Sequence, residues 1–300
     1  MIYYDNRNKR LVYTGDASSA EFWDGFWMRT ETSASVFRPR TGKRAWVVKV
    51  TNAYLKPGDG PILEGGCGGG DKLSLLHHHG FQVVGVDYAR RTVETLSRVA
   101  PELDVRYGDV RRLDFADGYF AGYWSLGVIE HFHEGYEAIA LEMARVIRPG
   151  GYLFITFPWM NRIRRIKARR GVYPIAKDPL DEPFYQFALH APHVRRDFEH
   201  LGFQMVAQGY PSVISGMIQD ARLLARPLAA LQRVRNRDLP TKAMWYALDR
   251  VLNTTVGGIF SHEVLLVMRK IASVSQRRAS GTIDEETMTV ACEGPSPALS

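Results

Sequence analysis

The sequence predicts an α/β fold built on a doubly wound, mostly parallel sheet. From residue 51 onward, short apolar runs alternate with segments of helical periodicity, and this alternation is typical of parallel sheets. The first apolar run leads into "ILEGGCGGGD" (62–71), in which five glycines fall within six residues before a predicted helix. A strand, a glycine-rich turn and a helix in this order predict a ligand site at the carboxyl edge of the sheet.

The strands and helices follow one another regularly. The helix predicted at 135–147 places Ile139, Met143, Val146 and Ile147 on one face, at i, i+4, i+7 and i+8. The other predicted helices are 71–79, 90–99 and 192–203. Strands are predicted at 61–64, 82–87, 104–107, 120–125, 152–157, 204–210 and 262–270.

The segments outside this regular pattern divide the chain into an N-terminal segment, a main domain and a C-terminal tail. Residues 1–48 are rich in aromatic side chains and are expected to form an N-terminal lid segment, with a helix beginning near Ser18, where "SSAE" fits a capping box. Residues 49–272 are expected to form the main domain. It carries helical cap insertions at about 158–190 and 211–257, and a disordered tail follows at 273–300.

Composition narrows the class of protein. The chain has 300 residues, is 45% hydrophobic, and has two cysteines placed far apart, which predicts neither a disulfide framework nor a zinc site. The N-terminus has no apolar signal-peptide core and no apolar run approaches 18 residues, so a cytoplasmic location is expected.

The basic charge is concentrated in one part of the chain. The net charge is +7, and residues 161–237 hold 14 Lys or Arg against 6 Asp or Glu. The cluster "NRIRRIKARR" at 161–170 fits peripheral contact of 162–170 with an anionic membrane or an anionic substrate, and it fits a solvated helix face equally well. Nucleic acid is not expected, because no RNA-binding module accompanies the charge.

Two ligand classes compete for the glycine run. The dinucleotide fingerprint G-x-G-x-x-G, started at Gly66, requires a third glycine at position 71, where Asp71 would repel a pyrophosphate. The frame that fits is E-x-G-x-G-x-G, formed by Glu64, Gly66, Gly68 and Gly70. A carboxylate directly before the turn suits a cationic ligand.

The segment 61–270 resembles the class I S-adenosylmethionine-dependent methyltransferases, the small-molecule type, with the glycine run as motif I. The resemblance implies a Rossmann-like, seven-stranded sheet with an antiparallel last strand. It implies S-adenosyl-L-methionine as the cofactor, with the backbone of Gly66, Cys67, Gly68 and Gly70 passing under its methionine part and Glu64 helping to hold its amino group.

Later motifs of the resemblance follow in the expected order. "VVGVDYA" places Asp87 to accept the ribose hydroxyls and Tyr88 near the adenine, and "GDVRRLDF" places Asp109 and Val110 at the adenine ring. "YFAGYWSLGVIEHF" resembles the fourth-strand motif and contributes Ser125. One departure is Ala121, where relatives usually carry Asp.

Histidines and aromatic residues supply the remaining candidates. His131 follows the fourth strand and is the candidate general base, with a pocket-floor role as the alternative. Trp27, Tyr185 and His190 are candidate substrate contacts. No metal site is expected, because consecutive side chains of the run His77–His79 point in different directions on a helix.

The sequence therefore predicts a methyltransferase acting on a small or lipid-linked acceptor, such as a glycan or secondary metabolite, with O-methylation favoured. Two alternatives stay open: a catalytically inactive methyltransferase-like binding subunit, and a nicotinamide oxidoreductase.

Overall fold

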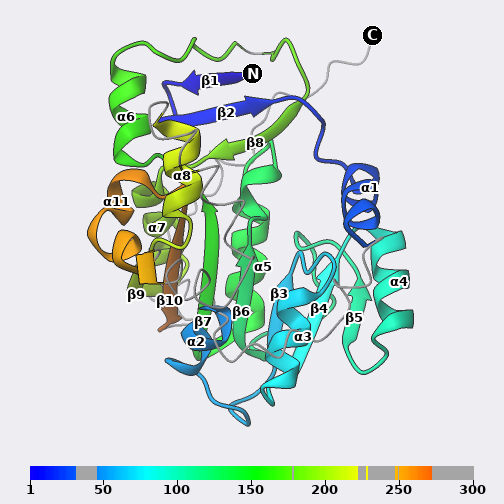
Figure 1. Cartoon of the computed structure of the whole chain (residues 1–300). Helices are drawn as coiled ribbons and strands as arrows, with labels where there is room; N and C mark the ends of the chain where they lie inside the picture. Colours follow the sequence, from blue (N-terminus) through cyan, green and yellow to red (C-terminus); the bar gives the residue numbers. More distant parts are fainter. Residues whose placement is uncertain (32–45, 178, 222–227, 229–246, 249, 272–300) are drawn as a thin grey trace.

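A seven-stranded mixed sheet forms the centre of the protein (Figure 1). The structure is a computed structural model, and it describes residues 1–31, 46–177, 179–221, 228, 247–248 and 250–271. The strand order is β5-β4-β3-β6-β7-β10-β9; β5, β4, β3, β6 and β7 are parallel, and β10 is antiparallel to both of its neighbours. The bounds are β3 Ile62–Gly65, β4 Val83–Asp87, β5 Asp104–Tyr107, β6 Phe120–Leu126, β7 Ile147–Pro158, β9 Phe203–Gly209 and β10 Glu263–Lys270. The predicted sheet and its antiparallel last strand are confirmed.

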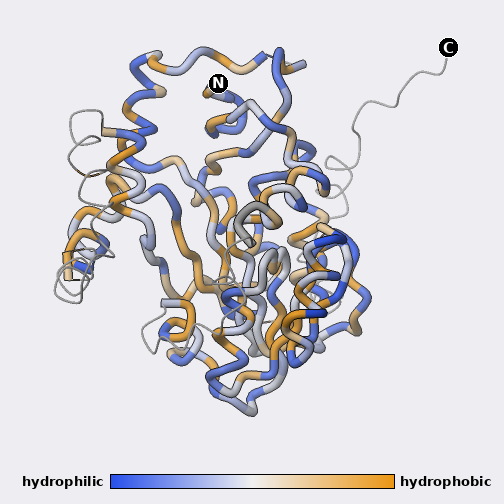
Figure 2. The backbone as a smooth tube through the Cα atoms, turned by 45° about the vertical axis from the view of Figure 1, so that its right-hand side comes forward, coloured by the Kyte–Doolittle hydropathy of each residue, from blue (hydrophilic) through white to orange (hydrophobic). Residues whose placement is uncertain are grey.

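The central strands β3, β4, β6, β7 and β10 are buried on both faces, which explains their apolar runs. Along β7, Leu153 and Ile155 pack into one hydrophobic cluster while Phe154, between them, packs into the other. Successive strand residues point to opposite faces, so a strand that is covered on both sides reads as continuously apolar. Figure 2 shows hydrophobic residues along the central strands.

Helices cover the two faces separately. Apolar residues of α2, α3 and α4 belong to one cluster, and apolar residues of α5 and α7 belong to the other. The bounds are α2 Trp46–Asn52, α3 Asp71–His78, α4 Arg90–Val99, α5 Glu137–Val146 and α7 Ala191–His200. The doubly wound arrangement places the β3–α3 and β4–α4 turns at the same edge of the sheet.

A second, three-stranded sheet lies beyond the central one, in the order β1-β2-β8 (Figure 1). Its strands are β1 Ile2–Asp5, β2 Arg10–Thr14 and β8 Phe184–Ala188, and both pairings are antiparallel. The sequence predicted a lid at 1–48 and a helical insertion at 158–190, and it missed these strands. The pairing of β2 with β8 joins residues more than 160 positions apart, and no local pattern indicates it.

The other elements in the described ranges are helices. The expected lid helix is α1, Ala20–Glu31, and the cap insertions contribute α6 Arg162–Arg169, α8 Val213–Asp220 and α11 Gly257–Phe260. A one-turn helix, η1 Ile129–His131, follows β6. Residues 32–45, most of the insertion after α8, and the predicted tail 273–300 lie outside the described residues. Within the described ranges, no helix combines the length and apolar character needed to cross a membrane.

Candidate functional site

The glycine loop joins β3 to α3 and is held against β4. The backbone N–H groups of Gly66 and Cys67 both donate to the carbonyl of Val86, at 2.8 and 3.1 Å. Gly66 and Gly68 have φ of +75° and +47°, in the region that favours glycine, and a Cβ at Gly68 would collide with the Trp27 ring. Glycine is therefore required both by the backbone conformation and by the close approach of a neighbouring side chain.

Asp87, at the end of β4, is fixed by the backbone around it. Its Oδ2 accepts from Gly68 N–H at 2.8 Å and its Oδ1 from Ala89 N–H at 2.9 Å. Burial raises the pKa of Asp87, and the surrounding backbone hydrogen bonds partly oppose that rise. Each carboxylate oxygen keeps a second lone pair, so the oriented group can still accept hydrogen bonds from a ligand in the pocket that it lines.

Glu64 is a buried acid behind the same loop. It is 3% exposed, and Leu73 N–H at the start of α3 donates to it, while its Oε2 has no hydrogen-bond partner among the described residues. Burial, followed by the negative charge of Asp71, raises the pKa of Glu64 to about 8; Lys72 opposes this rise, and Asp87 adds a smaller contribution to it. An unpaired buried acid of this kind is costly unless a cation or donor reaches it.

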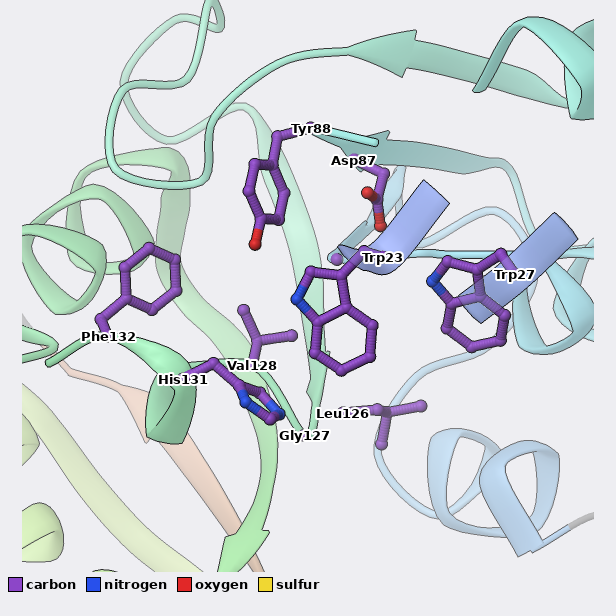
Figure 3. Close-up of a pocket in the computed structure, with 10 residues that line it drawn as sticks. Trp23, Trp27, Asp87, Tyr88, Leu126, Gly127, Val128, His131 and Phe132 are labelled. Carbon is purple, nitrogen blue, oxygen red and sulfur yellow. The ribbon is translucent and has the colours of Figure 1, made fainter. Parts of the chain in front are cut away.

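The lid helix α1 brings two indoles to the glycine loop. Trp23 and Trp27 line the pocket, and Figure 3 shows Trp23 lying between Tyr88 and His131, with Trp27 beside it. Asp24 fastens the helix by accepting from the N–H groups of Arg91 and Thr92, which are free donors in the first turn of α4. The lid is thus tied to the helix that follows Asp87 in the chain.

Ser18, just before α1, connects the two sides of the pocket. Tyr88 donates its hydroxyl proton to the Ser18 carbonyl at 3.0 Å, and the Ser18 hydroxyl donates to the His131 carbonyl at 3.0 Å. The ends of β4 and β6 are therefore bridged by the segment that carries the lid. Burial, followed by the charge of Asp87, raises the pKa of Tyr88 to about 12, so the hydroxyl stays a donor at neutral pH.

His131 lies in η1 with one ring nitrogen fixed. Its Nδ1 is 2.9 Å from the Tyr185 carbonyl of β8, and because a carbonyl only accepts, Nδ1 carries the proton and Nε2 keeps a lone pair. Burial lowers the pKa of His131 to about 4, and the bond to Tyr185 opposes this only in part. The ring packs edge-on against Trp23, with centroids 4.9 Å apart. The imidazole is therefore neutral at pH 7.

The cavity enclosed by these groups is small, about 70 Å³. Its lining combines Gly66, Asp87, Tyr88, Trp27 and His131 with residues that the sequence analysis did not single out as site residues. These are Trp23, Leu126, Gly127, Val128 and Phe132. The signal for four of them was the end of β6 and the stretch directly after it, since residues at the carboxyl ends of parallel strands meet at one edge of the sheet.

Several predicted residues lie beside this pocket or away from it. Ser125 is fully buried in β6 and its hydroxyl has no hydrogen-bond partner among the described residues, and Val110 belongs to the core. Asp109 lies off the pocket lining and binds the guanidinium of Arg111, with its closest contact at 2.7 Å. His190 lines a separate cavity next to α6. The structure thus gathers the loop, Asp87, Tyr88, Trp27 and His131, and places His190 elsewhere.

Comparison with known proteins places this arrangement in a family. Residues 63–155, from β3 into β7, match the family model described as a methyltransferase domain. The chain carries a class I S-adenosylmethionine-dependent methyltransferase domain. The match runs through the glycine loop, Asp87 and His131, and S-adenosylmethionine is the cofactor of this family.

Two curated relatives support the same assignment of this methyltransferase domain. A probable S-adenosylmethionine-dependent methyltransferase of Mycolicibacterium smegmatis is 29% identical over 144 residues, which is 48% of this chain and 52% of the relative. The cypemycin N-terminal methyltransferase of a Streptomyces species is 31% identical over 152 residues, which is 48% of this chain and 60% of the relative. The aligned region thus spans little more than half the length of these relatives.

Solved structures share the fold of the methyltransferase domain. The [4+2]-cyclase SpnF superposes with a TM-score of 0.52 at 18% identity, covering 86% of this chain and 98% of that one. A chain from the complex of the Haloferax volcanii Trm112 methyltransferase activator with a putative methyltransferase gives 0.52 at 15% identity, covering 85% and 98%. One of these proteins is named as a cyclase, so the fold alone does not assign the reaction.

The residues of this chain fit a cationic, adenosine-bearing ligand. The unpartnered Oε2 of Glu64 suits an ammonium group, and the positive-φ glycines leave backbone where side chains would intrude. The cavity of about 70 Å³ is far below the roughly 300–1,000 Å³ of ligand pockets, because the indoles of α1 lie against the loop. The indole of Trp27 therefore occupies space directly beside the glycine loop.

Proposed function

We propose that this chain is an S-adenosylmethionine-dependent methyltransferase that methylates a hydroxyl oxygen of a small or lipid-linked acceptor. The observation that carries the proposal is the pair of buried acids beside one glycine loop: Glu64 with an unpartnered oxygen and Asp87 oriented by two backbone donors. Glu64 would hold the amino group of the cofactor and Asp87 the ribose hydroxyls.

When bound, the cofactor supplies an electrophilic methyl group for in-line displacement. The task of the protein is to align the acceptor with that methyl and to exclude water. Trp23, Trp27, Val128 and Phe132 give the pocket apolar walls suited to this exclusion. Closure of α1 over the ligand would complete the enclosure.

His131 is proposed as the group that takes the acceptor proton. A hydroxyl loses its proton as the new bond forms, and the Nε2 lone pair of a neutral imidazole can accept it at the pocket wall. Tyr185 contributes by fixing the tautomer through its carbonyl, which makes it a positioning residue for His131. This geometry favours an acceptor that must be deprotonated, and it supports O-methylation.

The test begins with cofactor binding. Calorimetric titration with S-adenosylhomocysteine is expected to show micromolar affinity in the wild type and at least about a hundredfold loss in Asp87→Ala, because bidentate charge-assisted hydrogen bonds are lost. Asp104→Ala, at the opposite end of the neighbouring strand, is the matched control and is expected to bind normally. Binding of NAD in place of S-adenosylhomocysteine would instead support an oxidoreductase.

The second stage is an acceptor screen by mass spectrometry with labelled cofactor. Products methylated on oxygen among glycans, lipids and hydroxylated metabolites would support the proposal. Methylation of peptide N-termini, the reaction stated in the name of the cypemycin relative, would replace the oxygen acceptor with nitrogen. Cofactor binding without turnover on any acceptor would favour the inactive binding subunit.

A further inference from the structure

A second cavity lies outside the methyltransferase pocket and shares none of its lining residues. It measures about 350 Å³ and is lined by Tyr4 of β1, Lys9, Met160, Arg165 and Arg169 of α6, and His190. The β1–β2 turn, α6 and the residue before α7 therefore meet around one hollow. Three of its six lining residues are cations, and no carboxylate lines it.

The basic side chains of helix α6 form two sets, one that contacts Asp220 and one that lines the cavity. Arg164 is fully buried with its Nε 2.9 Å from Asp220, and Lys167 donates to the Asp220 carbonyl at 2.6 Å. Arg165 and Arg169, one turn apart, instead face the cavity. Both side chains are exposed at the cavity mouth, and like charges at i and i+4 repel one another, so an anion between the two guanidiniums would relieve this repulsion.

Lys9 reaches the same cavity from an unusual backbone conformation. It closes the β1–β2 turn with φ of +53°, the only non-glycine residue in the described chain with positive φ. The nearby Asp5 is already engaged by Asn8 and by Arg10 at 2.9 Å. Throughout the described ranges, no carboxylate forms an ion pair with Lys9, Arg165 or Arg169.

His190 lines the cavity beside the basic residues. Its Nδ1 is buried and has no hydrogen-bond partner among the residues that the structure describes, and its ring lies 4.3 Å from that of His193. Burial lowers the pKa of His190 to about 4, and the nearby charges of His193, Arg165 and Lys9 add to this lowering. Lys9 and Arg165 therefore make the surroundings of His190 positive.

We propose that Lys9, Arg165, Arg169 and His190 form a binding site for a phosphoryl group, either on a free phosphorylated compound or on a lipid headgroup. Two guanidinium forks and one ammonium supply three positive charges and most of the donors, and the neutral imidazole of His190 can add one N–H donor. Planar guanidinium groups match phosphate oxygens in bidentate geometry. This inference is independent of the methyl-transfer reaction.

The experiment compares two double variants that remove the same charge from the same helix. Arg165→Gln/Arg169→Gln removes two positive charges from the cavity lining. Arg162→Gln/Arg170→Gln removes two positive charges from residues that are also exposed but do not line the cavity. The full chain is titrated calorimetrically with inorganic phosphate and pyrophosphate. It is also sedimented with phosphatidylcholine vesicles containing phosphatidic acid.

The cavity variant is expected to lose at least about tenfold in affinity for the probe that the wild type binds, and the control less than about twofold. Lys9→Gln, which leaves α6 untouched, is expected to weaken the same probe, so misfolding of the helix cannot account for the loss. Binding of phosphate or pyrophosphate without vesicles assigns a free ligand, and vesicle binding assigns a headgroup. The proposal is overturned if the wild type binds no probe or if both double variants lose equally.

Discussion

Ionisation of Glu64 should couple cofactor binding to pH. The carboxyl is buried behind the glycine loop, and its pKa of about 8 leaves it mostly protonated at neutral pH. An ammonium group is bound well only by the ionised carboxylate, so binding must release the proton. Affinity is therefore expected to rise as the pH rises toward 8.

The size of the effect follows from the ionised fraction of Glu64. With a pKa of about 8, about 1% of the carboxyl is ionised at pH 6 and about 9% at pH 7. Apparent affinity scales with the competent fraction, so the dissociation constant should fall about ninefold over this interval, equal to about 1.3 kcal/mol. Both pH values lie below the ordinary α-amino pKa of about 7.7–8.0, so the charge of the ligand changes little.

Calorimetry with S-adenosylhomocysteine, in two buffers of different ionisation enthalpy, measures both the affinity and the released proton. Glu64→Gln should bind with a flat pH profile and without proton release. Glu130→Gln removes another fully buried carboxyl, one that does not line the pocket, and should keep the wild-type slope. A wild-type dissociation constant that changes less than threefold between pH 6 and 7 would refute the reasoning.

Three further predictions concern the base, the lid and the core. His131→Gln should lower kcat by about 10²–10⁴-fold with little change in cofactor affinity, measured by steady-state kinetics; a loss below threefold would remove His131 as the base. Trp27→Ala should raise the cofactor association rate constant at least about fivefold in stopped flow, because the indole no longer lies against the glycine loop. Phe26→Ala on the same helix should leave the rate constant unchanged. Equal rate constants in the two variants would contradict the idea that Trp27 obstructs cofactor entry. Arg164→Ala should lower the free energy of unfolding in urea by about 3–5 kcal/mol, because buried Asp220 loses its partner guanidinium. Adding Asp220→Ala should restore part of that loss. A double variant no more stable than the single one would argue against this ion pair.

The sequence alone determined the central sheet and the meeting of the glycine loop with Asp87, because these features are encoded locally. A strand buried on both faces is apolar throughout, and helix α5 shows its stripe within ten residues. Glu64 and Asp87 lie at the carboxyl ends of β3 and β4, and the glycines follow β3. Parallel strands bring such ends together at one edge of the sheet. Order along the chain was therefore enough to predict that these groups meet.

Only the tertiary structure decided which distant segments complete the site. Trp27 lies against Gly68, Tyr185 fixes the tautomer of His131, and β8 joins the β1–β2 hairpin, all through contacts between residues 41 to more than 160 positions apart. The same packing removed His190 from the methyltransferase pocket and placed it beside Lys9 and α6. Such contacts depend on how whole elements pack against one another, and no periodicity or spacing within a segment carries that information.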